Sequence, residues 1–410
     1  MAVQFPFPIN WSSSFDSRWS YLTDIFTTRT GMETRRSSRQ KPRRLLQFSI
    51  RVDGTALTAL NRLMASTQDL RVAVPDPSRV TSITTPITIG NARLMLAGGR
   101  PAWAVIGNDV LLGSTQHRIV GIAAGYVDVE PGVPADVPAG TRVQHLLFGY
   151  LGQSISSPHK TNAVADMRVT FECEAGWETR AEDRFSETQW MGKDVFPFVH
   201  NWREEQSVDH IWPAETVDFG FGRMGRYTPI PFPTQTRSTS LLLGSLAEAE
   251  RVLAFFHRHR GRRGSFYRST GENDMQLAAP MVAGETHVRV DANVQALFAD
   301  DLVHRAIEIQ QGGTVFRALI EDMSLVSGSS WLALNAALPF SGAADRISWL
   351  YRSRLESDEL SMSWVTDTVA RCSLPTRSLP FDELATGAAL RITPEGDFRE
   401  TPEGDDRIVF

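Results

Sequence analysis

The chain has 410 residues and a formal net charge of −5; 42% of its residues are hydrophobic and 22% are charged. This length predicts two or more domains, and the composition is that of a folded chain and excludes a disordered one. The acidic balance argues against a general nucleic-acid binder, and the sequence predicts no specific nucleic-acid contact.

An aromatic segment near the start occurs twice in the chain. FPFPINW lies at Phe5–Trp11 and FPFVHNW lies at Phe196–Trp202, so five of seven letters agree at an offset of 191 residues. Three more matched pairs follow in the same order, and their offsets drift slowly upward. They are Gly54–Ser66 with Gly244–Phe256, Val110–Ile122 with Ile307–Leu319, and two strands that end at Cys173 and Cys372. Matches in register predict an internal duplication.

Alternating apolar residues predict half-buried antiparallel strands. The segments Leu46–Val52 and Met167–Cys173 alternate apolar and polar residues with period two. Cys173 and its expected counterpart Cys372, at the end of the equivalent strand, are therefore read as core residues and not as nucleophiles. A hairpin signature, in which two apolar runs flank a small polar turn, is strongest at Gly312 and Gly313.

Each repeat is expected to contain one main helix. Breaker-free runs with apolar residues three apart predict helices at Ala56–Thr67 and Ser245–His259. The fold class is therefore mainly β: two homologous sandwich- or barrel-like repeats with minor α content. The expected divisions are residues 1–177 for the first repeat, 178–194 for a charged linker, 195–376 for the second repeat, and 377–410 for an extended C-terminal arm.

Two basic segments are candidates for contacts with acidic neighbours. Arg35–Arg44 can instead be a solvated loop before a strand, and Phe255–Arg268 a helix end whose basic last turn suits the helix dipole, with Gly261 as its C-cap. Because 39 of the 42 basic residues are arginine, clusters of arginine are weak signals in this chain. The candidate interface residues are Arg35, Arg36, Arg43, Arg44, Arg258, Arg260, Arg262 and Arg263.

No catalytic constellation stands out in the sequence. His257 and His259 are two residues apart and face apart on a helix, and the other histidines have no ligand spacing. The carboxylate pairs Glu204–Glu205 and Asp300–Asp301 are expected to be solvated. We therefore predict no enzymatic activity, no cofactor and no metal.

The order of features in each half resembles the distal tail proteins of tailed bacteriophages and gene transfer agents. The first half supplies FPFPINW, TGMETRR and PRRLLQFSI; the second supplies FPFVHNW and LAFFHRHRGRRGSFY. The first half lacks the Phe-Phe-x-x-x-x-Gly element, the second lacks Gly-x-Glu-x-Arg, and a tandem copy departs from the family's single unit. The resemblance implies a structural virion protein: a baseplate ring at the tail tip that joins the tail tube to the hub or tail fibre proteins.

A duplicated chain suits a symmetric ring, because two repeats per chain halve the number of subunits. We expect a homo-oligomer, a trimer with pseudo-sixfold symmetry in preference to a hexamer. Two cysteines give no disulfide framework, and no signal peptide or membrane run is recognised, so assembly in the host cytoplasm is expected. The alternatives are a tail-associated hydrolase and a carbohydrate-binding host-recognition protein that uses Trp11, Trp202 and Trp212. The equivalence of Trp11 and Trp202 favours a core or ring-contact role for them.

Overall fold

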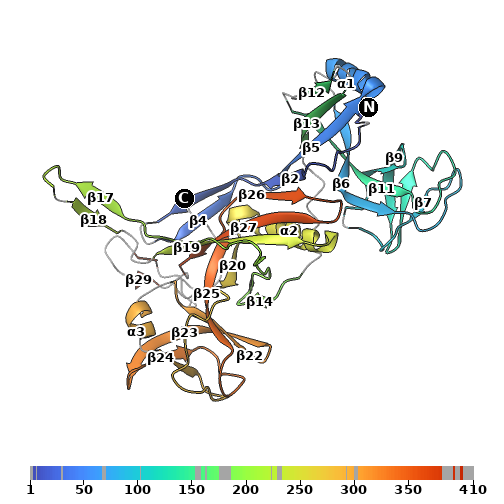
Figure 1. The fold of residues 1–410 in the computed structure, drawn as a ribbon. Coiled ribbons are helices and arrows are strands. Elements are labelled where there is room, and N and C mark those ends of the chain that lie inside the picture. Colours follow the sequence, from blue (N-terminus) through green and yellow to red (C-terminus); the bar gives the residue numbers. More distant parts are fainter. Residues whose placement is uncertain are drawn as a thin grey trace.

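The structure is a computed structural model, and it has a mainly β fold, as the alternating sequence patterns predict (Figure 1). It describes residues 3–5, 7–28, 31–66, 71–101, 103–152, 158–161, 164–174, 186–222, 224–228, 233–291, 293–299, 303–380, 391–392 and 398–399. Strands dominate these residues, which contain three α-helices.

The described residues of the first half form thirteen strands and one α-helix. In chain order they are β1 (Val3–Gln4), β2 (Phe15–Ser20), β3 (Thr23–Thr27), β4 (Glu33–Ser37), β5 (Arg43–Asp53), α1 (Gly54–Ser66), β6 (Val72–Ser82), β7 (Arg93–Met95), β8 (Asp109–Leu112), β9 (Thr115–Ile122), β10 (Tyr126–Glu130), β11 (Arg142–Leu151), β12 (His159–Thr161) and β13 (Val164–Cys173).

The second half contains the remaining elements. They are β14 (Gln189–Trp190), β15 (Lys193–Asp194), β16 (Val208–Ile211), β17 (Glu215–Asp218), β18 (Met224–Tyr227), β19 (Thr234–Leu243), α2 (Leu246–His259), the 3-10 turn η2 (Gly261–Arg263), β20 (Ser265–Ser269), β21 (His287–Val290), α3 (Asn293–Phe298), β22 (Ala306–Gln311), β23 (Thr314–Val326), β24 (Ser329–Leu334), β25 (Arg346–Leu355), β26 (Glu359–Trp364), β27 (Ala370–Leu379), β28 (Arg391–Ile392) and β29 (Phe398–Arg399).

The two halves have the same order and pairing of their central strands. In the first half β5 pairs with β2 and β13, β13 with β11 and β12, and β11 with β6. In the second half β19 pairs with β16 and β27, β27 with β25 and β26, and β25 with β20. A helix follows β5 and another follows β19. The common origin of the two halves stays a prediction.

The halves join through one continuous sheet and one core. Strand β2 pairs along one edge with β5 of its own half and along the other with β26 of the second half. The sheet therefore runs β13-β5-β2-β26-β27-β19-β16, and β2, β26, β27 and β19 cross the centre of Figure 1. Leu46, Phe48 and Ile50 of β5 belong to the same buried cluster as Phe255 and Phe256 of α2. Burial of this shared apolar surface holds the halves together.

Each half also carries a lobe with its own core, inserted between two neighbouring strands. The first lobe, β7 to β10, lies between β6 and β11 and has a separate buried cluster. The second, β21 to β24 with α3, lies between β20 and β25 and likewise has its own cluster. The hairpin expected at Gly312 and Gly313 joins β22 to β23, and both glycines have the positive φ that a tight turn requires.

The helices follow the sequence prediction closely. Helix α2 begins at Leu246, where the Glu248 amide donates to Ser245 Oγ (3.3 Å), and Gly244 N–H donates to Glu248 Oε2 (2.8 Å). Its C-cap is Arg260, which has φ 50°, and not Gly261 as the sequence predicted. Gly261 is still required, because it also has positive φ and a Cβ there would lie 2.5 Å from Asp358 Oδ1.

The expected equivalence of the two cysteines is wrong. The ladder pairs Met167 with Ile50 and Cys372 with Leu241, so Cys372 occupies the place of Met167, near the start of β27. Cys173 ends β13 and is half-buried against the core. Matching two segments on a shared final cysteine ignored the register that pairing to β5 and β19 imposes.

The structure also bears on the expected linker, the expected C-terminal arm and the pair Trp11 and Trp202. Residues 186–194 of the expected linker pack against α2, where Glu187 binds Arg251 (2.6 Å) and Asp194 binds Arg258 (2.7 Å). Most of the expected C-terminal arm lies outside the described residues, although its first residues complete β27. Trp11 and Trp202 are 38% and 74% exposed, so a core role for this pair is wrong.

Candidate interaction surfaces and a pocket

The two basic segments, 227 residues apart in sequence, meet in the structure. Strand β4 lies against η2, where Arg35 Nη1 lies 3.5 Å from the carbonyl oxygens of both Arg262 and Gly264. Arg262 in turn donates to the Thr23 carbonyl (3.0 Å) and forms an ion pair with Asp358 (3.2 Å). These contacts dock the β3–β4 hairpin of the first half onto the second half.

The eight candidate arginines differ in what they can contact. Arg36, Arg43 and Arg263 are exposed, and Arg35, Arg258, Arg260 and Arg262 are half-buried. Arg44 is only 4% exposed, and its Nη2 lies 2.6 Å from Asp76 Oδ2, which is fully buried. Arg44 therefore serves the core of the subunit, and reversing its charge would disturb folding.

His257 and His259 also belong to the core. His257 Nδ1 lies 3.0 Å from Tyr21 Oη, a hydrogen bond that joins α2 to the first half. His259 Nδ1 donates to the Phe255 carbonyl (2.9 Å), and burial lowers the pKa of His259 to about 4. Within the described residues, no group of three or more metal-ligating side chains is gathered.

The β17–β18 hairpin carries the most exposed large apolar side chain among the described residues. It holds the position in the second half that the docked β3–β4 hairpin holds in the first, between β16 and β19, but it projects away from the body (Figure 1). Phe221 at its tip is 94% exposed. The other exposed apolar side chains on the hairpin or beside it are Trp212, Val217, Phe219, Met224 and Tyr227. Several large apolar side chains exposed on one hairpin make it a candidate binding interface.

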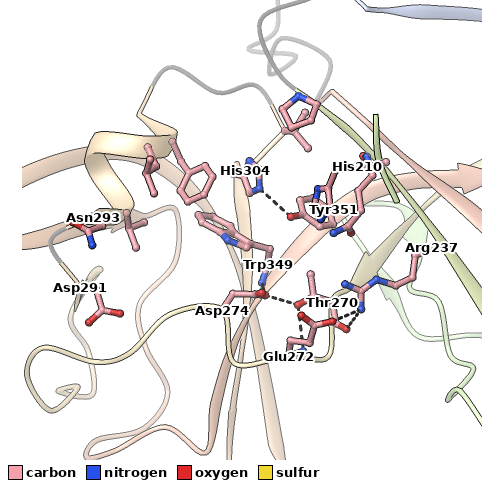
Figure 2. A pocket seen from close by; sticks show the side chains of 17 residues that line it. His210, Arg237, Thr270, Glu272, Asp274, Asp291, Asn293, His304, Trp349 and Tyr351 are labelled. Carbon is pink, nitrogen blue, oxygen red and sulfur yellow. Dashed lines mark hydrogen bonds and ion pairs between the residues drawn. The ribbon is translucent and has the colours of Figure 1, made fainter. Parts of the chain in front are cut away.

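A pocket of about 680 Å³, lined by both polar and apolar side chains, lies between β19 and the second lobe (Figure 2). One wall is aromatic: the ring of His304 lies 4.2 Å from that of Phe298 and 4.7 Å from that of Trp349. Tyr351 Oη and His304 Nε2 are hydrogen-bonded at 2.9 Å.

Three carboxylates, Glu272, Asp274 and Asp291, also line the pocket (Figure 2). Arg237 Nη1 forms an ion pair with Glu272 (2.9 Å), while its Nε is buried with no hydrogen-bond partner. Asp274 accepts hydrogen bonds from the Trp349 amide (2.7 Å) and from the Thr270 hydroxyl. Burial raises the pKa of Asp274 despite these two bonds.

Sequence reasoning missed both the hairpin and the pocket. The sequence signal that could have found the hairpin is FGFGRMG (Phe219–Gly225), where glycines beside phenylalanines indicate a turn. The pocket left no local signal, because its residues come from six separated segments. The Glu204–Glu205 pair is exposed as expected, whereas Asp300–Asp301 lies outside the described residues.

Comparison with known proteins assigns this chain to no family. No protein-family model matches the sequence, and no curated protein matches it. None of the helices in the described part of the chain has the length and apolar character needed to span a membrane.

Proposed function

We propose that this protein is a ring-forming structural component of a phage tail tip. In this role three chains, each with two similar halves, form a pseudo-sixfold ring between the tail tube protein and the baseplate hub or tail fibre proteins. The sequence resemblance to distal tail proteins supplies the tail location and these partners.

The observation that carries the proposal is the contact between β2 and β26. Six residues of β2, from Phe15 to Ser20, pair with β26 and set the first half beside the second. Because the halves have the same pairing order, this contact joins two similar units head to tail. Head-to-tail contacts between similar units generate a ring when the rotation closes.

The two hairpins support the same conclusion. The β3–β4 hairpin docks onto the second half, where Arg354 Nε binds Glu33 Oε2 (2.8 Å). The β17–β18 hairpin occupies the corresponding place but extends beyond the last unit of the chain, with its apolar side chains exposed. A neighbouring chain would supply the surface that this hairpin lacks.

The test is the mass and symmetry of the assembled protein. Light scattering on the purified full chain is expected to give a mass of three chains, and electron micrographs a ring with six similar units. Six chains per ring would refute the trimer and keep the ring. A chain that stays monomeric at every concentration, and in the particle, would refute the proposal.

The pocket favours carbohydrate binding as a second candidate function. Aromatic faces pack against sugar rings, and planar carboxylate, amide and guanidinium groups bridge neighbouring hydroxyls; the pocket offers both kinds of group. Saturation-transfer NMR with glucose, galactose and N-acetylglucosamine tests it. Binding that is weakened by Tyr351→Phe and kept by Glu321→Gln, an exposed carboxylate outside the pocket, would support it. Hydrolysis of a polysaccharide, lost in Glu272→Gln, would instead favour the hydrolase.

A further inference from the structure

Two arginines of the second half are buried next to each other. Arg237 of β19 is 4% exposed and Arg268 of β20 is 7% exposed. Arg268 Nη1 donates to the Arg237 carbonyl oxygen (3.1 Å) and to the Thr376 hydroxyl. Its Nη2 donates to Thr239 Oγ1 (2.6 Å). All of these acceptors are neutral, and no carboxylate of the described residues forms an ion pair with Arg268.

The charges of these two arginines are not balanced. Glu272, whose side chain is 55% exposed, supplies one negative charge through its ion pair with Arg237 (2.9 Å). Burial and the positive charge of Arg237 lower the pKa of Arg268 to about 9. A guanidinium nevertheless keeps its proton in proteins, and a buried charge is costly unless it is paired. The two arginines and Glu272 therefore leave one positive charge without a counter-charge.

The strand ladders show that the fold does not require a charged residue at this place. Arg237 of β19 pairs with Thr376 of β27. The same ladder position in the first half, 191 residues earlier on β5 and 205 residues earlier on β13, holds Leu46 opposite Phe171. Both of these apolar side chains are fully buried. Replacing buried charges by apolar residues is often neutral or stabilising, so an arginine kept where an apolar side chain can pack indicates a use for its charge.

A cavity of about 10 Å³ lies at these side chains, lined by Arg237, Arg268 and Ser378 among others. The bonds of Arg268 use three of its five N–H groups, and Arg237 Nε is buried with no hydrogen-bond partner. Ser378 Oγ accepts from the Gln235 amide (2.7 Å), which leaves the hydrogen of this hydroxyl to donate. A space of this size holds one water-sized particle and no polyatomic ligand. The cavity therefore combines donor groups, an excess positive charge and room for one atom.

We propose that a single chloride ion binds in this cavity, held by the guanidinium groups of Arg237 and Arg268 and by the Ser378 hydroxyl. Chloride accepts hydrogen bonds as a water molecule does, but it also neutralises the excess charge. The cavity shares Arg237 and Ser378 with the 680 Å³ pocket, so the two adjoin and the ion can enter through the pocket. The site does not depend on the proposed ring.

The experiment is urea unfolding of the full chain while chloride replaces methanesulfonate, which is too large for the cavity, at constant ionic strength. Because the ion binds only the folded chain, the folding equilibrium constant should rise about tenfold for each tenfold rise in chloride above the dissociation constant. Arg268→Met removes the excess charge and should abolish this dependence. Arg371→Met, which replaces an exposed arginine on β27, should keep it. Wild-type urea midpoints that do not change with chloride, or an Arg268→Met chain that keeps the dependence, would overturn the proposal.

A second measurement needs no substitution, and it decides the question if Arg268→Met does not fold. Bromide replaces chloride in sites of this kind and scatters X-rays anomalously. Crystals of the wild-type chain grown in bromide should show an anomalous peak within hydrogen-bond distance of Arg237 Nε and the Arg268 guanidinium. Density at this place without an anomalous signal would identify a water molecule and overturn the chloride site, as would anomalous peaks confined to the protein surface. Either result leaves the proposed ring standing.

Discussion

Replacing Arg44 should destabilise this protein strongly, whereas replacing its neighbour Arg43 should not. Both residues lie on β5 and both were candidates for an interface, but Arg43 is exposed and Arg44 is 4% exposed. Arg44 Nη2 lies 2.6 Å from Asp76 Oδ2, and its guanidinium lies 5.0 Å from the Trp19 ring centroid. Arg44→Met therefore leaves a fully buried carboxylate without its principal counter-charge.

The free energy of unfolding that Arg44→Met should lose depends on the groups that remain around Asp76. Removing one member of a buried ion pair costs about 3–5 kcal/mol. Arg79 Nε stays 3.6 Å from Asp76 Oδ2, and Ser78 still donates to Oδ1 from its amide (3.0 Å) and its hydroxyl (2.6 Å). These partners place the loss near the lower end, about 3 kcal/mol. For Arg43→Met, an exposed change, the loss should stay within about 0.5 kcal/mol.

The pH dependence adds a second readout to the same comparison. Burial alone raises the pKa of Asp76, but Arg44, Arg79 and the Ser78 bond outweigh it, so the pKa lies below its usual value. A depressed carboxyl pKa stabilises the fold above the unfolded value, about 3.9, and this stability is lost as the pH falls through the folded pKa. Arg44→Met should weaken that acid dependence.

Urea unfolding followed by tryptophan fluorescence measures both effects, with wild type, Arg43→Met and Arg44→Met compared at pH 7 and at pH values below the unfolded pKa of about 3.9. Equal urea midpoints for the two variants would refute the buried-pair reasoning. So would an Arg44→Met chain that unfolds like wild type but no longer assembles, because Arg44 would then act at an interface.

Three further predictions concern positions where the structure is specific. Gly149→Ala should destabilise by about 3 kcal/mol, since a Cβ there would lie 2.0 Å from the Glu172 carbonyl oxygen; Gly125→Ala, which meets nothing within 4 Å, should be neutral in the same thermal melt. Because the pKa of Asp274 is raised in the folded state, the wild type should lose stability as the pH rises from the pKa of Asp in the unfolded chain through that of Asp274 in the folded chain. Asp274→Asn should remove this loss, and urea midpoints of the two proteins that differ by the same amount at every pH would contradict the prediction. Cys372, whose thiol pKa burial raises to about 12, should resist iodoacetamide at pH 8 until the protein is unfolded, and rapid native labelling would contradict its burial.

The sequence by itself determined the elements. Period-two alternation in Leu46–Val52 placed its apolar side chains inside, and breaker-free runs placed both long helices to within two residues. It also gave the offset of 191 residues, which separates the pair Ser17–Leu46 of β2 and β5 from the pair Val208–Arg237 of β16 and β19. These features are local, because side-chain direction along a strand or helix depends on only a few neighbouring residues.

The tertiary structure alone decided which surfaces remain for other molecules. Arg43 and Arg44 look alike in sequence, yet alternation along β5 buries one against Asp76 and exposes the other. The two hairpins occupy the same place in their halves, but only β3–β4 finds a unit of its own chain to dock on. The pocket joins β19 to residues more than 100 positions later. Pairing of distant strands creates each of these differences, and no short window of sequence encodes the strand that a given edge will meet.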